Sequence, residues 1–104
     1  MNVIISVIIC THNGERYLEQ SLESVFNQSL EKKKYEIIVV DNLSKDYTKE
    51  IIEKYIKQYD NVKYIFEPKL GLSNARNTGV YHSSGKYVAF LDDDAFACNE
   101  WLNK

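Results

Sequence analysis

Four apolar stretches alternate with amphipathic stretches along the chain. The apolar stretches cover residues 3–9, 35–40, 62–66 and 87–91, and residues 37–40 are apolar without interruption. A continuous apolar run is typical of a strand that is covered on both faces, as in a parallel sheet. The pattern therefore predicts four strands, and we expect the second of them to be the most deeply buried.

The stretches between these runs repeat their apolar residues at the spacing of a helix. One apolar stripe lies within residues 18–26, a second within residues 51–59, and a weaker third within residues 72–80. We expect Ser44 to begin the second helix and Gly85 to follow the end of the third. The order βαβαβαβ predicts an α/β layered domain with a mainly parallel central sheet flanked by helices.

Composition narrows the class of protein. A chain of 104 residues that is 44% apolar and 27% charged is typical of one soluble domain. Its net charge of −2 gives no electrostatic reason to expect nucleic acid or an anionic membrane as partner. Cys10 and Cys98 form no zinc-binding pattern, so we expect reduced thiols and a cytoplasmic protein. The apolar N-terminal run is far shorter than the ~20 residues of a membrane span, so we expect no transmembrane segment in this chain.

Polar residues follow every predicted strand. They occupy residues 11–14, 41–42, 67–77 and 92–94. Because ligands of parallel α/β sheets bind outside the carboxyl ends of the strands, we expect these residues to form a ligand cleft. The chain has no glycine-rich P-loop and no GxGxxG turn, which excludes the motifs of P-loop and dinucleotide-binding proteins.

The acidic triplet Asp92, Asp93 and Asp94 is the most specific feature of this cleft. Adjacent carboxylates repel one another unless water, donors or a cation neutralise them. Mg²⁺ and Mn²⁺ prefer oxygen ligands and are often held by one or two carboxylates together with substrate phosphates. The triplet therefore predicts a divalent metal site, and the alternative is an acidic surface turn that binds nothing.

Three further residues near the strand ends have alternative interpretations. Asp41 can accept hydrogen bonds from a base or ribose, or it can cap the next helix, and Asn42 can assist either role. Arg76 can clamp a diphosphate as a planar fork or brace an aspartate, or it can be an exposed helix arginine. His12 lies near the cleft, where a lone histidine is more often structural than catalytic.

Four segments of the chain resemble glycosyltransferases of family 2. They are residues 6–14, 36–42, 71–79 and 85–94, with Trp101-Leu102 following, and they cover nearly the whole chain in the family's order. The resemblance implies a Rossmann-like GT-A fold and a nucleotide-sugar donor. It also implies sugar transfer with inversion, usually with Mn²⁺ or Mg²⁺, in the synthesis of polysaccharides, glycolipids or glycoproteins.

The resemblance also implies roles for single residues. Thr11, His12, Asn13 and Asp41 would hold the base and ribose of the donor, and Arg76 would lie near the diphosphate or the acidic cluster. Where the family commonly has proline, this chain has Cys10, at the end of the first strand.

The acidic triplet matches the family's DxD motif. Asp92 and Asp94 would be its outer members, with Asp94 meeting the metal and Asp92 meeting the donor's ribose or the metal shell. Asp93 is acidic as well, which leaves the register of these roles open and adds Asp93 to the expected donor-binding residues.

The family places its catalytic base and acceptor site well downstream of the DxD motif. We therefore expect residues 1–104 to be the donor-binding half of a truncated GT-A domain, inactive in isolation, in a natural protein that continues. A UDP-sugar is the expected donor, with GDP- and dTDP-sugars as alternatives, and the acceptor is a saccharide, lipid or protein not identified by the sequence. The expected location is cytoplasmic, with peripheral association at the inner membrane face as the alternative. The alternative function is a nucleotide- or metal-binding α/β module without transfer activity of its own. Sugar-nucleotidyltransferases and receiver domains share the layered α/β plan, but the loops of this chain match theirs poorly.

Overall fold

The computed structural model describes residues 3–95, 97–98 and 101–103. Four parallel strands form one sheet in the order β3-β2-β1-β4. The strands are β1 (Ile5–Thr11), β2 (Tyr35–Asp41), β3 (Val62–Phe66) and β4 (Tyr87–Asp92). This arrangement confirms the predicted α/β fold with a mainly parallel sheet.

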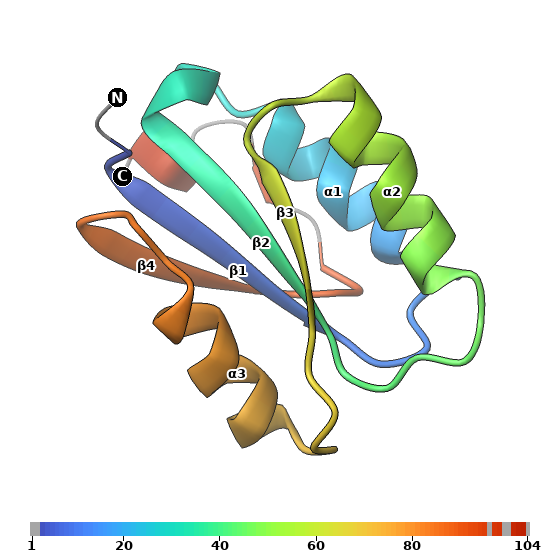
Figure 1. Ribbon diagram of the computed structural model, residues 1–104. Helices are drawn as coiled ribbons and strands as arrows, with labels where there is room; N and C mark the ends of the chain where they lie inside the picture. The colour runs from blue at the N-terminus through green and yellow to red at the C-terminus, as the bar shows by residue number, and fades with distance from the viewer. Residues whose placement is uncertain (1–2, 96, 99–100, 104) are drawn as a thin grey trace.

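The helices lie on both faces of the sheet (Figure 1). They are α1 (Leu18–Phe26), α2 (Thr48–Gln58) and α3 (Leu72–Tyr81), with two short 3₁₀ helices, η1 (Lys32–Lys34) and η2 (Trp101–Asn103). Helices α1 and α2 cover one face, and α3 covers the other. Each of the three predicted apolar stripes belongs to a helix, but not every member is buried: Ile56 of α2 and Leu72 and Val80 of α3 are exposed, and α3 packs on the sheet through Ala75 and Gly79.

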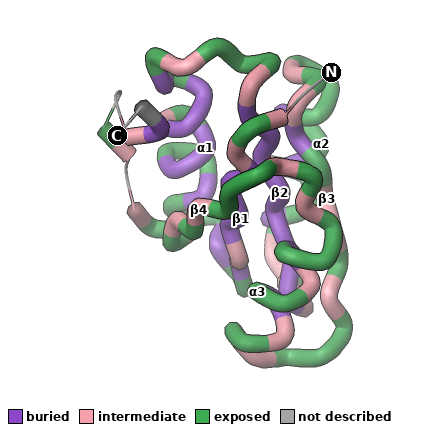
Figure 2. Tube along the Cα trace, turned by 90° about the vertical axis from the view of Figure 1, so that its left-hand side faces the viewer, coloured by how far each residue is buried: buried purple, intermediate pink, exposed green. Residues whose placement is uncertain are grey.

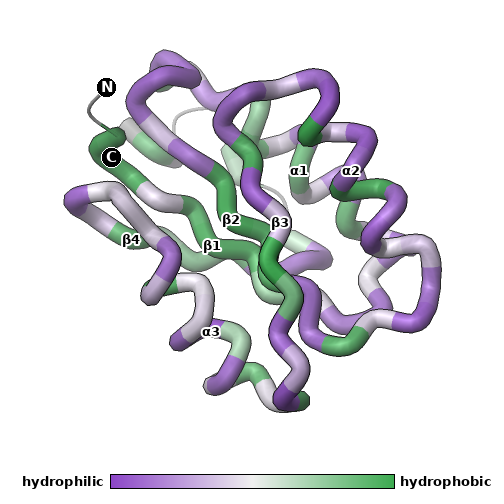
Figure 3. The backbone as a smooth tube through the Cα atoms, viewed as in Figure 1, coloured by the Kyte–Doolittle hydropathy of each residue, from purple (hydrophilic) through white to green (hydrophobic). Residues whose placement is uncertain are grey.

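The core is centred on β2, which is buried along its whole length (Figure 2). Side chains alternate between the two faces of a strand. Accordingly, Ile37 and Val39 pack with α1 and α2, whereas Ile38 and Val40 pack with Ala75 of α3. Because both faces of β2 are covered, both sets must be apolar, which explains the uninterrupted run, and in Figure 3 the later parts of β1 and β2 are coloured as hydrophobic.

Two predicted helix boundaries are wrong. Ser44 does not begin α2: the helix starts at Thr48, whose backbone N–H donates to Asp46 Oδ1 at 3.0 Å. Gly85 does not end α3, because that helix stops at Tyr81. Gly85 instead lies against β1, where an added Cβ would come within 2.6 Å of the Ser6 backbone nitrogen. Only glycine lets the chain pass this close to β1 as it enters β4.

The strand limits also differ from the apolar runs. β1 begins two residues later than predicted and extends to Thr11, while β2 and β4 each extend to an aspartate. Backbone pairing continues past the last apolar residue, since Thr11 still pairs with Asp41. Beyond β4, Trp101–Asn103 form a short 3₁₀ helix.

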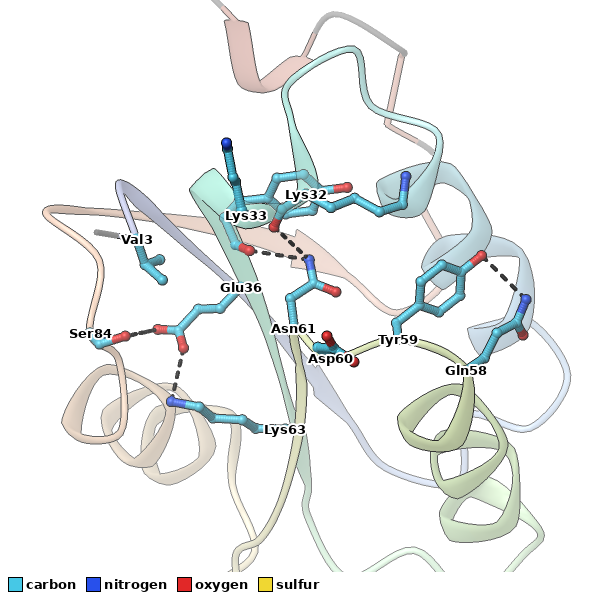
Figure 4. A pocket seen from close by; sticks show the side chains of 11 residues that line it. Val3, Lys32, Lys33, Glu36, Gln58, Tyr59, Asp60, Asn61, Lys63 and Ser84 are labelled. Atoms are coloured by element: carbon cyan, nitrogen blue, oxygen red, sulfur yellow. Dashed lines mark hydrogen bonds and ion pairs between the residues drawn. The ribbon is translucent and has the colours of Figure 1, made fainter. Parts of the chain in front are cut away.

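A hollow of 630 Å³ lies at the amino end of the sheet, opposite the predicted cleft (Figure 4). Its main polar feature is Glu36, which is only 4% exposed. Glu36 Oε2 accepts hydrogen bonds from Ser6 Oγ at 2.6 Å and from the Ser84 backbone N–H at 2.7 Å, and Lys63 Nζ lies 2.9 Å from Oε1. Both oxygens of the Glu36 carboxylate therefore have partners. Through them Glu36 links β1, β2, β3 and the loop before β4.

The pH dependence of stability should report this cluster. Burial alone raises the pKa of Glu36, but the hydrogen bonds from Ser6, Lys63 and Ser84 outweigh it and lower the pKa to about 2. The carboxylate therefore stabilises the fold above its unfolded pKa of 4.5, and this contribution is lost as the pH falls toward 2. We expect Glu36→Gln to lower the free energy of unfolding by about 1–3 kcal/mol at neutral pH.

Urea unfolding of both proteins between about pH 7 and pH 2.5 measures this effect. The stability difference between wild type and Glu36→Gln should shrink through the acidic range. The matched control is Glu31→Gln, because Glu31 is exposed and pairs only at the surface with Lys33 and Lys34; its change should stay within about 0.5 kcal/mol. A Glu36→Gln difference that is constant with pH would contradict the assignment.

Candidate functional site

The carboxyl ends of the strands meet at one edge of the sheet, as predicted. Thr11 pairs with Asp41, Asp41 with Phe66, and Cys10 with Asp92. A hollow of 330 Å³ opens at this edge. It is lined by the ends of β1 and β2, the start of α3 and the turn after β4: Cys10, Thr11, His12, Asn42, Leu70, Gly71, Leu72, Ala75 and Asp93. We call this hollow the edge pocket.

Two loops that border the edge pocket are hydrogen-bonded to each other. The backbone N–H of Asn13 donates to Ser44 Oγ at 2.8 Å, and Asn13 Oδ1 accepts from the Lys45 N–H at 2.7 Å. Asn13 has a φ of 52°, a left-handed conformation that asparagine tolerates better than most residues. These bonds fix the loop after β1 against the loop after β2, so Asn13 shapes the rim of the pocket.

His12 reinforces the same junction. Its Nδ1 lies 2.6 Å from the backbone oxygen of Asn42. Because a carbonyl oxygen can only accept, Nδ1 carries the proton, and Nε2 is then the acceptor for Asn13 Nδ2 at 3.3 Å. His12 thus joins the loops after β1 and β2 at the pocket wall.

Asn42 fixes the third loop of the pocket. Its Nδ2 donates to the backbone oxygens of Glu67 and Lys69, each at 3.0 Å, and its Oδ1 accepts from the Gly71 N–H at 2.9 Å. A buried asparagine thus satisfies three backbone groups that would otherwise lack partners. The sequence places Asn42 beside the site but contains no signal for these contacts, which join residues far apart in the chain.

Asp41 lies beneath the pocket rather than in its lining. It is 2% exposed; its Oδ1 accepts from the Ser44 N–H at 3.0 Å and its Oδ2 from Tyr64 Oη at 2.6 Å. Burial and this bond raise the pKa of Tyr64, so the phenol stays a donor. Asp41 therefore closes the turn after β2, and it does not cap α2, which begins at Thr48. Tyr64 is a partner that the sequence analysis does not identify.

The acidic triplet divides into an anchored residue and two exposed ones. Asp93 Oδ2 accepts a hydrogen bond from Thr11 Oγ1 at 2.8 Å. Asp92 and Asp94 are exposed. The space around the anchored carboxylate is tight, since a Cβ at Gly14 would overlap Thr11 Oγ1 and lie 2.8 Å from Asp93 Oδ2. The middle aspartate thus faces the protein and its neighbours face outward.

The carboxylates of Asp92 and Asp94 fit a cation whose remaining coordination positions are filled by a bound ligand and water. Within the described ranges, no group of three or more His, Cys, Asp or Glu side chains is placed to hold a metal by itself. Mg²⁺ and Mn²⁺ commonly take one or two carboxylates and fill their remaining positions with phosphate oxygens and water. A turn with two exposed carboxylates, Asp92 and Asp94, leaves room for those phosphate and water ligands. A site in which protein groups filled every position would leave none.

Arg76 lies beside the edge pocket without lining it. Its guanidinium carbon is 5.5 Å from the centroid of the Phe90 ring, and the side chain is exposed. No ion pair of Arg76 with an aspartate is found among the described residues, so the bracing role is not seen there. The guanidinium is available to an anionic ligand.

Cys10 should serve as a reporter of the pocket. Burial raises the pKa of its thiol to about 11; Arg76 lowers it and Asp93 raises it to smaller extents. Because the thiolate is the reactive form, we expect iodoacetamide at about pH 8 to modify the exposed Cys98 well before Cys10. The Cys10 rate should rise steeply toward pH 11. Peptide mass spectrometry over time measures both rates, and equal rates at about pH 8 would contradict the prediction.

Comparison with known proteins identifies the family. The family described as "Glycosyl transferase family 2" matches residues 6–104, so the chain belongs to this family. The chain is 42% identical over 101 residues to glycosyltransferase AglE of Haloferax volcanii, a match that covers 96% of this chain and 33% of AglE.

Solved structures agree with this assignment. TarS of S. aureus in complex with UDP superposes with a TM-score of 0.91 at 33% identity, over 97% of this chain and 30% of the TarS chain. The mannosyltransferase PcManGT of Pyrobaculum calidifontis, in complex with GDP-Man and Mn²⁺, gives a TM-score of 0.84 at 26% identity, over 92% of this chain and 29% of its own. The fold is therefore the GT-A type expected from the sequence, and the chain spans about a third of the length of these proteins.

No helix within residues 3–95, 97–98 and 101–103 is both long enough and apolar enough to cross a membrane.

Proposed function

We propose that this chain is the donor-binding portion of an inverting glycosyltransferase that takes a nucleoside-diphosphate sugar. The observation that carries the proposal is the edge pocket itself: a hollow at the carboxyl ends of the strands, bordered by a turn with two outward-facing carboxylates. A UDP-sugar is the first donor to test, because TarS has been solved with UDP and with UDP-GlcNAc.

In this proposal each part of the pocket has a task. The Thr11, His12 and Asn13 segment and the turn closed by Asp41 bind the base and ribose. Arg76 faces the diphosphate, while Asp92 and Asp94 hold Mn²⁺ or Mg²⁺, and Asp93 anchors their turn. When bound, the cation acts as a Lewis acid that offsets charge on the departing nucleoside diphosphate. The protein residues hold the donor so that its anomeric carbon faces the acceptor.

Thermal unfolding with UDP, GDP, dTDP and CDP tests the proposal, each with Mn²⁺ and with EDTA. A ligand at about 100 times its Kd stabilises the folded state by about 2.7 kcal/mol. We expect one nucleotide to raise Tm in Mn²⁺ and to lose most of that effect in EDTA. Absence of any shift in the full-length protein would refute the proposal.

A binding module without transfer activity of its own is the second candidate. It is favoured by the length of the chain, which covers only 33% of AglE and 30% of the TarS chain. Release of free nucleotide from a nucleotide sugar separates the two candidates. Turnover by residues 1–104 alone would exclude the binding module, and turnover only by a longer natural chain would support it for this segment.

A further inference from the structure

Helix α1 makes polar contacts in addition to its apolar ones. Ser21, Ser24 and Gln28 are three and four residues apart, which places them along one side of the helix and its end. Their side chains hydrogen-bond the backbone of the segment that follows β4. We call these three residues the polar side of α1.

Two members of the polar side contact the segment beyond the acidic triplet. Ser24 Oγ accepts from the Ala97 N–H at 3.0 Å. Gln28 Nε2 donates to the Cys98 oxygen at 2.6 Å, and Gln28 Oε1 accepts from the Leu102 N–H at 2.9 Å. These contacts guide the chain along α1 after it leaves the site.

Ser21 contacts the acidic turn itself. Its side chain is fully buried, and its Oγ lies 2.8 Å from the backbone oxygen of Asp93 and 2.6 Å from that of Ala95. The backbone oxygen of Asp92 is 3.5 Å away. Three carbonyl oxygens thus converge on a hydroxyl that has one proton to donate. Without that hydroxyl, the backbone oxygens of Asp93 and Ala95 would lose this donor, while that of Asp92 would keep only the Ala95 N–H, so we expect the turn to open.

The turn is therefore held from two directions. Thr11 of β1 holds the carboxylate of Asp93, and Ser21 of α1 holds the backbone on the other side. Neither contact uses the carboxylates of Asp92 and Asp94. The backbone position fixed by Ser21 consequently decides where those two carboxylates lie relative to each other.

We propose that Ser21 is a positioning residue that fixes the acidic turn, so that Asp92 and Asp94 present their carboxylates together to a divalent cation bound with the ligand's diphosphate. This inference rests on the proposed function. Residues that orient metal ligands from behind commonly change metal affinity about 10- to 100-fold when they are replaced.

Ser21→Ala and Ser24→Ala in the full-length protein form a matched pair, since each removes one hydroxyl that bonds the segment after β4 from the same side of α1; Ser21 is buried and Ser24 half-buried. The readout is the metal enhancement, defined as the Kd of the nucleotide in EDTA divided by its Kd in Mn²⁺. We expect Ser21→Ala to reduce this ratio about tenfold or more, with the Kd in EDTA nearly unchanged. Ser24→Ala should keep the ratio.

Amide hydrogen exchange gives a second readout that needs no ligand. The Ala95 N–H donates to the Asp92 oxygen at 3.1 Å within the turn. It should exchange faster in Ser21→Ala than in Ser24→Ala. If Ser21→Ala does not fold, Ser21→Cys replaces it, because a thiol keeps a weaker donor of similar shape.

The outcomes separate the inference from the proposal beneath it. Wild-type protein without metal enhancement for any of the four nucleotides overturns the proposed function, and the inference with it. Enhancement that is present in wild type and survives in Ser21→Ala overturns the inference alone. So does an equal loss of enhancement in both alanine variants, because that would make the effect one of general stability.

Discussion

Asp94→Ala is expected to reduce nucleotide-sugar turnover by about 10²- to 10³-fold, the range measured when one preorganised electrostatic group is removed from an active site. Asp94 is exposed on the turn after β4, and Thr11 anchors its neighbour Asp93 and not Asp94 itself. The variant should fold normally, because the Asp94 side chain makes no hydrogen bond or ion pair with the part of the chain that the structure describes. Release of free nucleotide by the full-length enzyme in Mn²⁺ gives the rate, and Tm checks the fold.

Two further variants make this result specific. Asp93→Asn should lose far less activity, because an asparagine oxygen can still accept from Thr11. Asp60→Ala is the acidic control: Asp60 is exposed and lines the hollow at the opposite end of the sheet. A greater loss in Asp93→Asn than in Asp94→Ala would place the metal-binding register one residue earlier than proposed.

Gly14→Ala is expected to have the second-largest effect, on both stability and ligand binding. Its Cβ would overlap Thr11 Oγ1 and lie 2.8 Å from Asp93 Oδ2, so the two partners of the anchoring hydrogen bond must separate. Overpacking of this kind costs about 1–3 kcal/mol of folding free energy. The metal enhancement of nucleotide binding should fall about tenfold, because the acidic turn loses one of its two attachments.

A double-mutant cycle with Thr11→Ala separates these causes. Thr11→Ala removes the anchoring hydroxyl without adding volume, so it should lower the metal enhancement with a smaller loss of stability. In Gly14→Ala combined with Thr11→Ala the overlap with Thr11 Oγ1 is relieved, and the Asp93 carboxylate, no longer held by Thr11, can move away from the added Cβ. The pair should therefore be more stable than the sum of the single changes predicts. Additive stability losses, measured by urea unfolding, would show that the overlap is not the cause.

The strands are predicted well from the sequence because buried strand positions are occupied by apolar residues. β2 is apolar on both faces since helices cover both, and this alone indicates a parallel sheet. The start of α2 is predicted wrongly because Ser44 and Asp46 are both good capping residues. Only the folded loop shows that Asp46 reaches Thr48, whereas Ser44 binds Asn13.

Only three of the predicted site residues, Thr11, His12 and Asp93, line the edge pocket, and their contacts are not predictable from the sequence. Topology brings Thr11, His12 and Asp93 to one pocket, as parallel strands require. Which aspartate faces inward depends on Thr11, and the backbone of the turn depends on Ser21; both partners lie far from the turn in sequence. No periodic pattern in the sequence predicts contacts between residues so far apart. Ser21, Tyr64 and the contacts of Asn42 are therefore visible only in the structure.

The position of β1 in the sheet has a consequence for synthesis on the ribosome. β1 is made first but pairs with both β2 and β4, and Thr11 and Asp93 are 82 residues apart. Domains tend to fold as units while the chain emerges, and such distant pairings form slowly. Until β4 has been made, one side of the isoleucine-rich β1 is an open edge that another chain can pair with. The open edge of β1 is therefore exposed to other chains until β4 has been made, and the edge pocket can assemble only after that.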